Sequence, residues 1–369
     1  MPCRPSSSDW TTPDLAADAS GPGPLAARLG RTLVVGTVGG AVFAWLNLPL
    51  AWMLGAMVAT TVASLGGAKL HVPGPMRSIM VAVIGVLLGA SFTPEILDKV
   101  REWPLTIGCL VLHLGVLVAV LFLYFHRIVG LDAPTAYFSA APGGLSEMVI
   151  TGAAMGADDR TIALVHSSRV LLVVLTIPLW YRYMTGVTTT PSSIGPSIGA
   201  MGLADLAVLG ACAVAGVAVG RLIRLPAYRL SGPLLASALV HATGLNSSAP
   251  PWEVIAVAQV VVGSAIGARF TGVPVRRVLG LMAAALVSAV VMLAGTVAFA
   301  LVLAPATGID WRSIVLAYAP GGLAEMSLIA LSLGIETAFV ATHHVLRIGL
   351  IVAVAPLVFA RLGSPGGRR

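Results

Sequence analysis

The chain has 369 residues, of which 57% are hydrophobic and only 10% are charged, and its mean hydropathy is +0.94. A soluble domain of this length could not cover its surface with so few charged residues, which excludes a soluble enzyme. The formal net charge is +7, but the basic residues are scattered at the ends of apolar runs. No region is long and basic enough to form a DNA-reading domain, so we expect no direct contact with nucleic acid.

Several apolar runs are long enough to cross a bilayer. The run from Leu105 to Phe125 contains one histidine and no formal charge, and the run from Val278 to Ala304 contains no charge. About 20 helical residues cross a hydrocarbon core of about 30 Å, whereas a β-barrel would need short alternating strands. We therefore predict an all-α polytopic membrane protein. Its apolar segments lie, in chain order, at about 29–47, 49–66, 77–93, 104–125, 133–155, 160–184, 203–223, 230–247, 252–272, 278–304, 312–334 and 338–361.

The regions outside these segments differ from them in composition. The first residues are rich in Pro, Ser, Asp and Gly and contain no apolar core of a signal peptide, so we predict a disordered tail over 1–27. A stretch at 185–202 that is rich in Thr, Ser, Pro and Gly is predicted to be a linker between two membrane halves, 28–184 and 203–362. A short basic tail follows at 363–369.

The two halves match each other in sequence. The motif Ala-Pro-Gly-Gly-Leu-Ser-Glu-Met at 141–148 recurs as Ala-Pro-Gly-Gly-Leu-Ala-Glu-Met at 319–326, which is 178 residues later. The same shift, without a gap, relates further identical residues, namely His166 and His344, Arg169 and Arg347, Gly85 and Gly263, and Gly89 and Gly267. Agreement over this length predicts that the membrane region is a tandem duplication.

The charges in the loops predict how the halves are oriented, because Lys and Arg are enriched in cytoplasmic loops. With six crossings per half the halves would be parallel, and the loops that hold Arg221 and Arg276 would lie outside. With about five crossings per half, and a Pro-Gly-Gly segment that is broken or re-entrant, these arginines lie inside. We therefore predict two inverted repeats with cytoplasmic termini, an external linker and breaks near the bilayer midplane.

The repeated motif is expected to interrupt a helix. Proline lacks an amide donor and glycine lowers helix propensity, so the freed backbone groups need partners in the protein or in water. We predict that the motif lines a substrate or ion path, while a packing kink is the alternative. The residues concerned are Pro142, Gly143, Gly144, Pro320, Gly321 and Gly322.

Two carboxylates lie well inside apolar segments. Glu147 and Glu325 are equivalent in the two halves, whereas the other acidic residues lie in the tail or near segment ends. An intramembrane acid commonly marks a path for protons, ions or substrate. The alternative is a structural role, either in an ion pair or as a neutral carboxyl that bonds the backbone at the break.

Each half also carries an intramembrane cation. Arg169 and Arg347 follow His166 and His344 by three residues, which places each pair on one helical face. These side chains could pair with the glutamates or hold an anionic substrate, and a structural salt bridge is the alternative. We expect no metal site and no cofactor, because His343 points away from its neighbour and no other Cys or His has ligand spacing.

The paired Ala-Pro-Gly-Gly-Leu-Ser/Ala-Glu-Met motifs, in a duplicated chain of this length, resemble the membrane AbrB-type duplication family over about residues 28–362. Proteins of that family are labelled as transcriptional regulators, as ammonia monooxygenases or as transporters. The resemblance therefore implies membership rather than one activity. Nothing in the chain resembles the small soluble DNA-binding regulator that shares the AbrB name, so a regulatory role would be indirect.

These observations favour a secondary transporter of a small solute, coupled to protons or cations, in the bacterial inner membrane. The chain has no Gly-Lys-Ser/Thr loop for phosphate, which argues against direct ATP-driven transport. We do not expect an enzyme. The alternatives are a membrane sensor that regulates gene expression indirectly and, third, a membrane oxygenase. The expected partners are the bilayer and a small-molecule or ion substrate, and a homodimer is left open.

The predicted topology can be tested by labelling single cysteines after removal of the native ones, Cys3, Cys109 and Cys212. We expect Ser192→Cys, in the linker, to react with an impermeant reagent from the external side. A cysteine in the C-terminal tail should react only from the cytoplasmic side. Labelling of Ser192→Cys from the cytoplasmic side alone would contradict the inverted arrangement.

Overall fold

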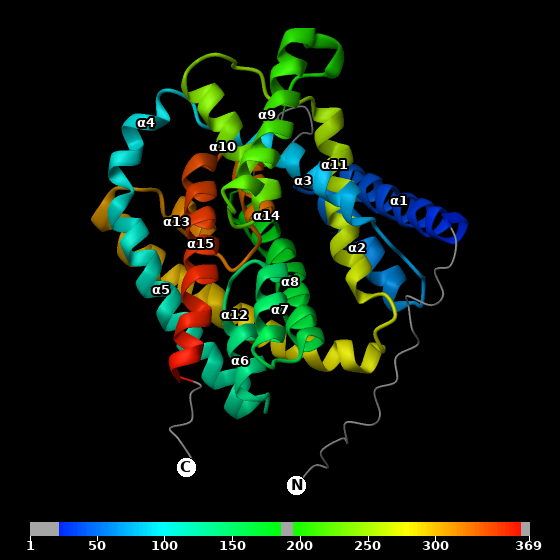
Figure 1. The fold of residues 1–369 in the computed structure, drawn as a ribbon, viewed down its shortest axis with the longest axis vertical. Helices are drawn as coiled ribbons and strands as arrows, with labels where there is room; N and C mark the ends of the chain where they lie inside the picture. Colours follow the sequence, from blue (N-terminus) through cyan, green and yellow to red (C-terminus); the bar gives the residue numbers. More distant parts are fainter. Residues whose placement is uncertain (1–21, 186–194, 363–369) are drawn as a thin grey trace.

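The computed structural model describes residues 22–185 and 195–362, and every regular element in these ranges is a helix (Figure 1). The predictions for 1–21, 186–194 and 363–369 lie outside the described residues. The helices of the first half are α1 (Pro22–Trp45), α2 (Ala51–Leu65), α3 (Gly74–Gly89), α4 (Ile96–Lys99), η2 (Val100–Glu102), α5 (Pro104–Leu123), η3 (Tyr124–Ile128), α6 (Ala133–Ala140), α7 (Leu145–Ala154) and α8 (Asp159–Thr185). Those that follow are η5 (Ile198–Ala200), α9 (Leu203–Leu222), α10 (Tyr228–Ala242), α11 (Trp252–Gly267), η6 (Ala268–Phe270), α12 (Val275–Thr307), α13 (Trp311–Tyr318), α14 (Leu323–Ser332) and α15 (Thr337–Leu362).

The first helix begins earlier than the sequence analysis predicted. Residues 22–27, which we had assigned to the disordered tail, belong to α1. Proline is tolerated in the first turn of a helix, where the amide that it lacks would have no partner within the helix. The Pro-rich composition therefore marks the start of α1 rather than its absence.

Seven of the described helices contain stretches long and apolar enough to cross a membrane, namely α1, α5, α8, α9, α11, α12 and α15. Large apolar side chains are exposed on them, as with Leu203 of α9 and Val302 of α12, which are 87% and 71% exposed. Such surfaces suit acyl chains and not water. The apolar helices α2 and α3 have only 15 and 16 residues, so the number of about five crossings per half stays a prediction.

The predicted interruption of a helix at the repeated motif is confirmed in both halves. The apolar segment at 133–155 is split into α6, which ends at Ala140, and α7, which begins at Leu145. Between them the backbone is extended, with φ −63° and ψ 121° at Ala141 and φ −62° and ψ 135° at Gly144. The segment at 312–334 is split in the same way into α13 and α14.

The order of the helices repeats, and the contacts between the halves are reciprocal. A shift of 178 residues moves the first residues of α6, α7 and α8 onto those of α13, α14 and α15. Helix α3 of the first half packs against α10 of the second half. The second-half equivalent of α3 is α11, and it packs against α2 of the first half. A two-fold relation between two units produces such pairing. The packing does not give the direction of either half across a membrane, so the inverted orientation stays a prediction.

Glycines allow these helices to lie very close together. A Cβ atom at Gly85 of α3 would overlap the carbonyl oxygen of Leu230 in α10, and one at Gly263 of α11 would overlap that of Met53 in α2. Small residues let membrane helices approach in this way. Figure 1 shows α7, α8, α14 and α15 in the middle of the molecule, between α1, α2, α3 and α11 on one side and α5 and α13 on the other.

This packing predicts that Gly85→Ala and Gly263→Ala destabilise the protein. Each added methyl forces two helix backbones apart, and overpacking of this kind costs about 1–3 kcal/mol. The control is Gly30→Ala in α1, where an added Cβ meets no atom within 4 Å. Thermal unfolding of the purified protein in detergent should show lower midpoints for the first two variants only. Equal midpoints for all three would show that the close approach does not contribute to stability.

Candidate functional site

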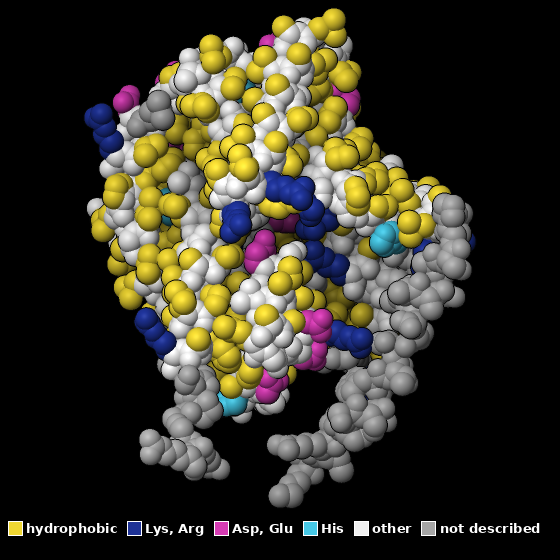
Figure 2. Space-filling view, in the orientation of Figure 1, with side chains coloured by type: hydrophobic (Ala, Val, Ile, Leu, Met, Phe, Trp, Pro, Cys, Tyr) yellow, Lys and Arg dark blue, Asp and Glu magenta, His cyan; other side chains and the backbone are white. Residues whose placement is uncertain are grey.

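A cavity of about 260 Å³ lies where the N-terminal ends of α7 and α14 face each other. Both repeated motifs line it, together with residues of α3, α8, α10, α11, η6 and α15. Figure 2 shows Lys and Arg side chains gathered around a hollow near the centre of this face, with acidic side chains beside and within it. The charged residues that line the cavity are Arg77, Glu147, Arg169, Arg229, Arg269, Glu325 and Arg347.

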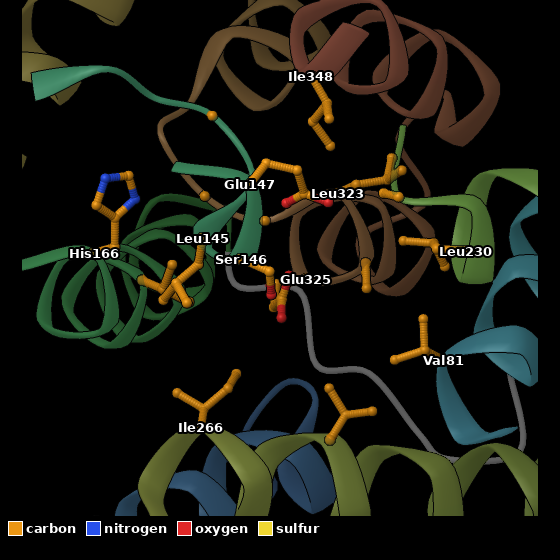
Figure 3. A pocket seen from close by; sticks show the side chains of 18 of the residues that line it. Val81, Leu145, Ser146, Glu147, His166, Leu230, Ile266, Leu323, Glu325 and Ile348 are labelled. Carbon is orange, nitrogen blue, oxygen red and sulfur yellow. The ribbon is translucent and has the colours of Figure 1, made fainter. Parts of the chain in front are cut away.

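The two glutamates face the cavity. Glu147 and Glu325 are the third residues of α7 and α14, both are half-buried, and Figure 3 shows both among the lining side chains. Neither carboxylate has a hydrogen bond or an ion pair with a residue in the described ranges. Pairing with Arg169 or Arg347, one of the roles that the sequence left open for these arginines, is therefore not found in this structure.

The two glycines of each motif leave room for two different side chains. A Cβ atom on Gly144 would overlap Oε2 of Glu147, whose carboxylate folds back over the start of α7. A Cβ atom on Gly143 would lie 2.9 Å from Sδ of Met148. The equivalent residues of the second motif make the same contacts. The motif is thus a compact unit in which one glycine accommodates the methionine and the other accommodates the acid.

In the first half, a histidine and an arginine of α8 hold the end of α6. The last carbonyl groups of a helix accept no hydrogen bond from the helix itself, so they need donors from elsewhere. His166 donates from Nε2 to the carbonyl oxygen of Phe138 at 2.9 Å, and Arg169 donates to that of Ser139 at 3.4 Å. Arg169 also donates to Nδ1 of His166 at 3.0 Å, which links the two side chains.

The second half repeats this arrangement at the end of α13. His344 donates from Nε2 to the carbonyl oxygen of Leu316 at 2.9 Å. Arg347 donates to the carbonyl oxygens of Ala319 and Gly321, which lie at and just beyond the end of the helix. Each intramembrane cation therefore stabilises a broken helix through its backbone, by hydrogen bonds rather than by a salt bridge.

The structure brings most of the predicted site residues together. Two of them do not line the cavity, because Pro142 and His344 are buried outside its wall. The predicted residues that line it are Gly143, Gly144, Glu147, His166, Arg169, Pro320, Gly321, Gly322, Glu325 and Arg347.

Sequence reasoning missed three arginines of the lining. Arg77 belongs to α3, Arg229 to α10 and Arg269 to η6, and they lie near segment ends, where a positive charge indicates only topology. Arg269 donates to Oγ of Ser167 at 3.4 Å and lines the cavity together with Arg77 and Glu325. Its position within the apolar segment 252–272 was the available signal, since an intramembrane cation is rarely without function.

The remaining intramembrane histidines have partners in the core. His343 lies 2.9 Å from Oγ1 of Thr106 and 2.8 Å from the carbonyl oxygen of Phe339. His113 lies 3.4 Å from Oγ1 of Thr296. Within residues 22–185 and 195–362, no group of three or more His, Cys, Asp or Glu side chains is placed to hold a metal ion.

Comparisons with known proteins show what the chain is similar to. A family model described as transition state regulatory protein AbrB matches residues 52–363. The protein YhjN of Bacillus subtilis (strain 168) is 29% identical over 366 residues, which cover 91% of this chain and 94% of that protein. The protein of Escherichia coli (strain K12) named "Putative regulator AbrB" is 28% identical over 327 residues, which cover 86% and 91% of the two chains.

The hydrogen bonds of the second half predict that Arg347→Met destabilises the protein. The variant leaves two buried carbonyl groups without a donor, at about 1–3 kcal/mol for each. The control is Arg361→Met on the same helix, where the side chain is exposed. Thermal unfolding in detergent should separate the two variants clearly. If Arg347→Met unfolds at the same temperature as the control, the arginine does not hold the broken helix.

Proposed function

Since the chain belongs to the AbrB family of membrane proteins, we propose that it is a secondary transporter of a small solute. The observation that carries this proposal is the cavity between the two broken helices, which both halves of the duplication line. Irregular backbone at membrane depth is tolerated where it lines a cavity, and discontinuous helices of repeated halves form the substrate and ion sites of many transporters.

We assign the coupling of transport to Glu147 and Glu325. Their carboxylates face the cavity without a hydrogen bond or an ion pair in the described part of the chain, so they are available to a proton or a cation. Intramembrane acids commonly serve such paths. Because the sequence contains no ATP-binding loop, an ion gradient is the proposed energy source.

We place the protein in the bacterial inner membrane with both termini in the cytoplasm. The seven long apolar helices support a multi-pass membrane protein, and the matched relatives are bacterial. The positions of the basic loops support the orientation.

A sensor that acts on gene expression without transport is the second candidate. It is favoured by the name of the Escherichia coli relative, which is a regulator. In this case the cavity would bind its ligand without moving it across the membrane. A membrane oxygenase, the third reading, would require copper or iron, and metal analysis of the purified protein would reveal a stoichiometric amount.

The solute can be found by comparing the metabolites of a deletion strain with those of its parent. Compounds that differ between the strains are then tested for flux into proteoliposomes that contain the purified full-length chain. Flux above that of empty liposomes, driven by a pH or cation gradient, supports the transporter. Saturable binding without flux favours the sensor.

The glutamates give the sharpest test of coupling. Glu147→Gln and Glu325→Gln mimic a permanently protonated carboxyl, so we expect each variant to insert and unfold normally but to lose gradient-driven flux. Glu→Lys at either position should impair folding as well, because it adds a further cation to an arginine-rich cavity. The control is Glu102→Gln on the exposed η2, which should transport normally. Unchanged rates and pH dependence in both cavity variants would assign the glutamates a structural role instead.

A further inference from the structure

We infer that the ligand of this cavity is a small organic anion whose charged group lies between the N-termini of α7 and α14. The inference rests on the proposed function in placing the solute in this cavity, and it names the chemical class of that solute.

The charges of the lining favour an anion. Five arginines and two glutamates line the cavity, an excess of three positive charges. Arg169 and Arg347 are each 2% exposed and line the same cavity. No carboxylate in the described ranges forms an ion pair with either of them. Burying two like charges without a counter-charge is costly, and an anion in the cavity would lower this cost.

The backbone of the cavity also suits an anion. Helices α7 and α14 have ten residues each, and their N-cap residues, Gly144 and Gly322, offer no side chain to the first amides. The first amide groups of a helix have no acceptor within it, and the helix dipole favours negative charge there. A second observation comes from the buried arginines, since Nε of Arg169 and Nε of Arg347 have no hydrogen-bond partner among residues 22–185 and 195–362.

The glutamates link this anion to the proton. Glu147 and Glu325 lie in the first turns of α7 and α14, so their negative charges occupy the place that an incoming anion would take. Protonation of a glutamate removes its charge and strengthens the positive potential at the helix ends. The same residues that take up the proton thereby raise the affinity for the anion, and the two ligands promote each other's binding.

The rest of the cavity suits a carbon body. Figure 3 shows the apolar side chains of Val81, Leu230, Ile266 and Ile348 around the two carboxylates. These groups offer no hydrogen bonds, so they favour an organic anion with an apolar portion. Carboxylate and phosphate groups share the chemistry that guanidinium and amide groups recognise.

The test measures the electrostatic potential of the cavity and does not require that the ligand be known. Two single-cysteine variants are made in a chain that lacks the native cysteines. Ser146→Cys is exposed in the cavity, and the control Ser247→Cys is exposed outside it. Each thiol is labelled with an anionic reagent, sulfonatoethyl methanethiosulfonate, and with a cationic one, trimethylammonioethyl methanethiosulfonate. We expect the ratio of anionic to cationic labelling rates to be about tenfold higher at Ser146→Cys, because a charged cleft concentrates counter-ions.

Second substitutions show which charges produce this ratio. Arg269→Gln should lower the ratio at Ser146→Cys, and Glu147→Gln should raise it. Salt at about 1 M, where the Debye length is about 3 Å, should reduce the difference between the two sites. Ser78→Cys lines the same cavity and serves as a second position if Ser146→Cys does not fold. A ratio that favours the cationic reagent, or that neither charge substitution changes, overturns the proposal.

Protection from labelling then tests the ligand class. Succinate and glycerol 3-phosphate are compared with uncharged succinamide and with the cation putrescine as inhibitors of labelling at Ser146→Cys. Protection by either anion alone supports the proposal and tells which group the cavity prefers. Protection by putrescine, or equal protection by succinamide, contradicts it. Absence of flux in proteoliposomes would reject the transporter but leave these labelling results unchanged, so the two failures can be distinguished.

Discussion

The structure depends on one constraint, which is that a helix broken inside an apolar medium leaves polar backbone groups that need partners. Each half of the chain is broken at the same motif, and each break has two ends. At the carbonyl end, the His and Arg side chains of α8 and α15 supply the donors. At the amide end the N-cap residue is glycine and no side chain of the described residues caps it by a hydrogen bond, although the carboxylate of Glu147 or Glu325 folds back over it. The break is therefore hydrogen-bonded by side chains on one side and faces the cavity and a carboxylate on the other.

The sequence match between the two halves includes the residues at the centre of the cavity but not those at its rim. The glutamates, the inner arginines and the motif glycines occur in equivalent pairs. The outer arginines do not, since the positions equivalent to Arg77 and Arg269 hold Ile255 and Ser91. The residues that bond each break therefore occur in both halves, whereas Arg77 and Arg269 of the rim each occur in one half only.

The sequence predicted the parts of this site that are local. The repeated motif showed where the helices break, and the spacing of His166 and Arg169 placed both on one helical face. Neither pattern could show which group lies across from that face, so pairing with the glutamates and binding of an anionic substrate both stayed open for the arginines, which in the structure bond carbonyl groups. Arg229 was missed for a related reason. The start of α10 lines the cavity because α10 packs against α3, and the sequence does not show this packing.

The hydrogen bonds at the breaks have a mechanical consequence. Because α8 is bonded to the end of α6, and α15 to the end of α13, neither α6 nor α13 can move away from its partner helix without breaking these hydrogen bonds. The close approach at glycines also pairs α3 with α10 and α2 with α11. One assembly then contains α6, α8, α13 and α15, the other contains α2, α3, α10 and α11, and residues of both line the cavity. A rearrangement that preserved all of these contacts would rotate one assembly against the other as rigid bodies, with the cavity at the pivot.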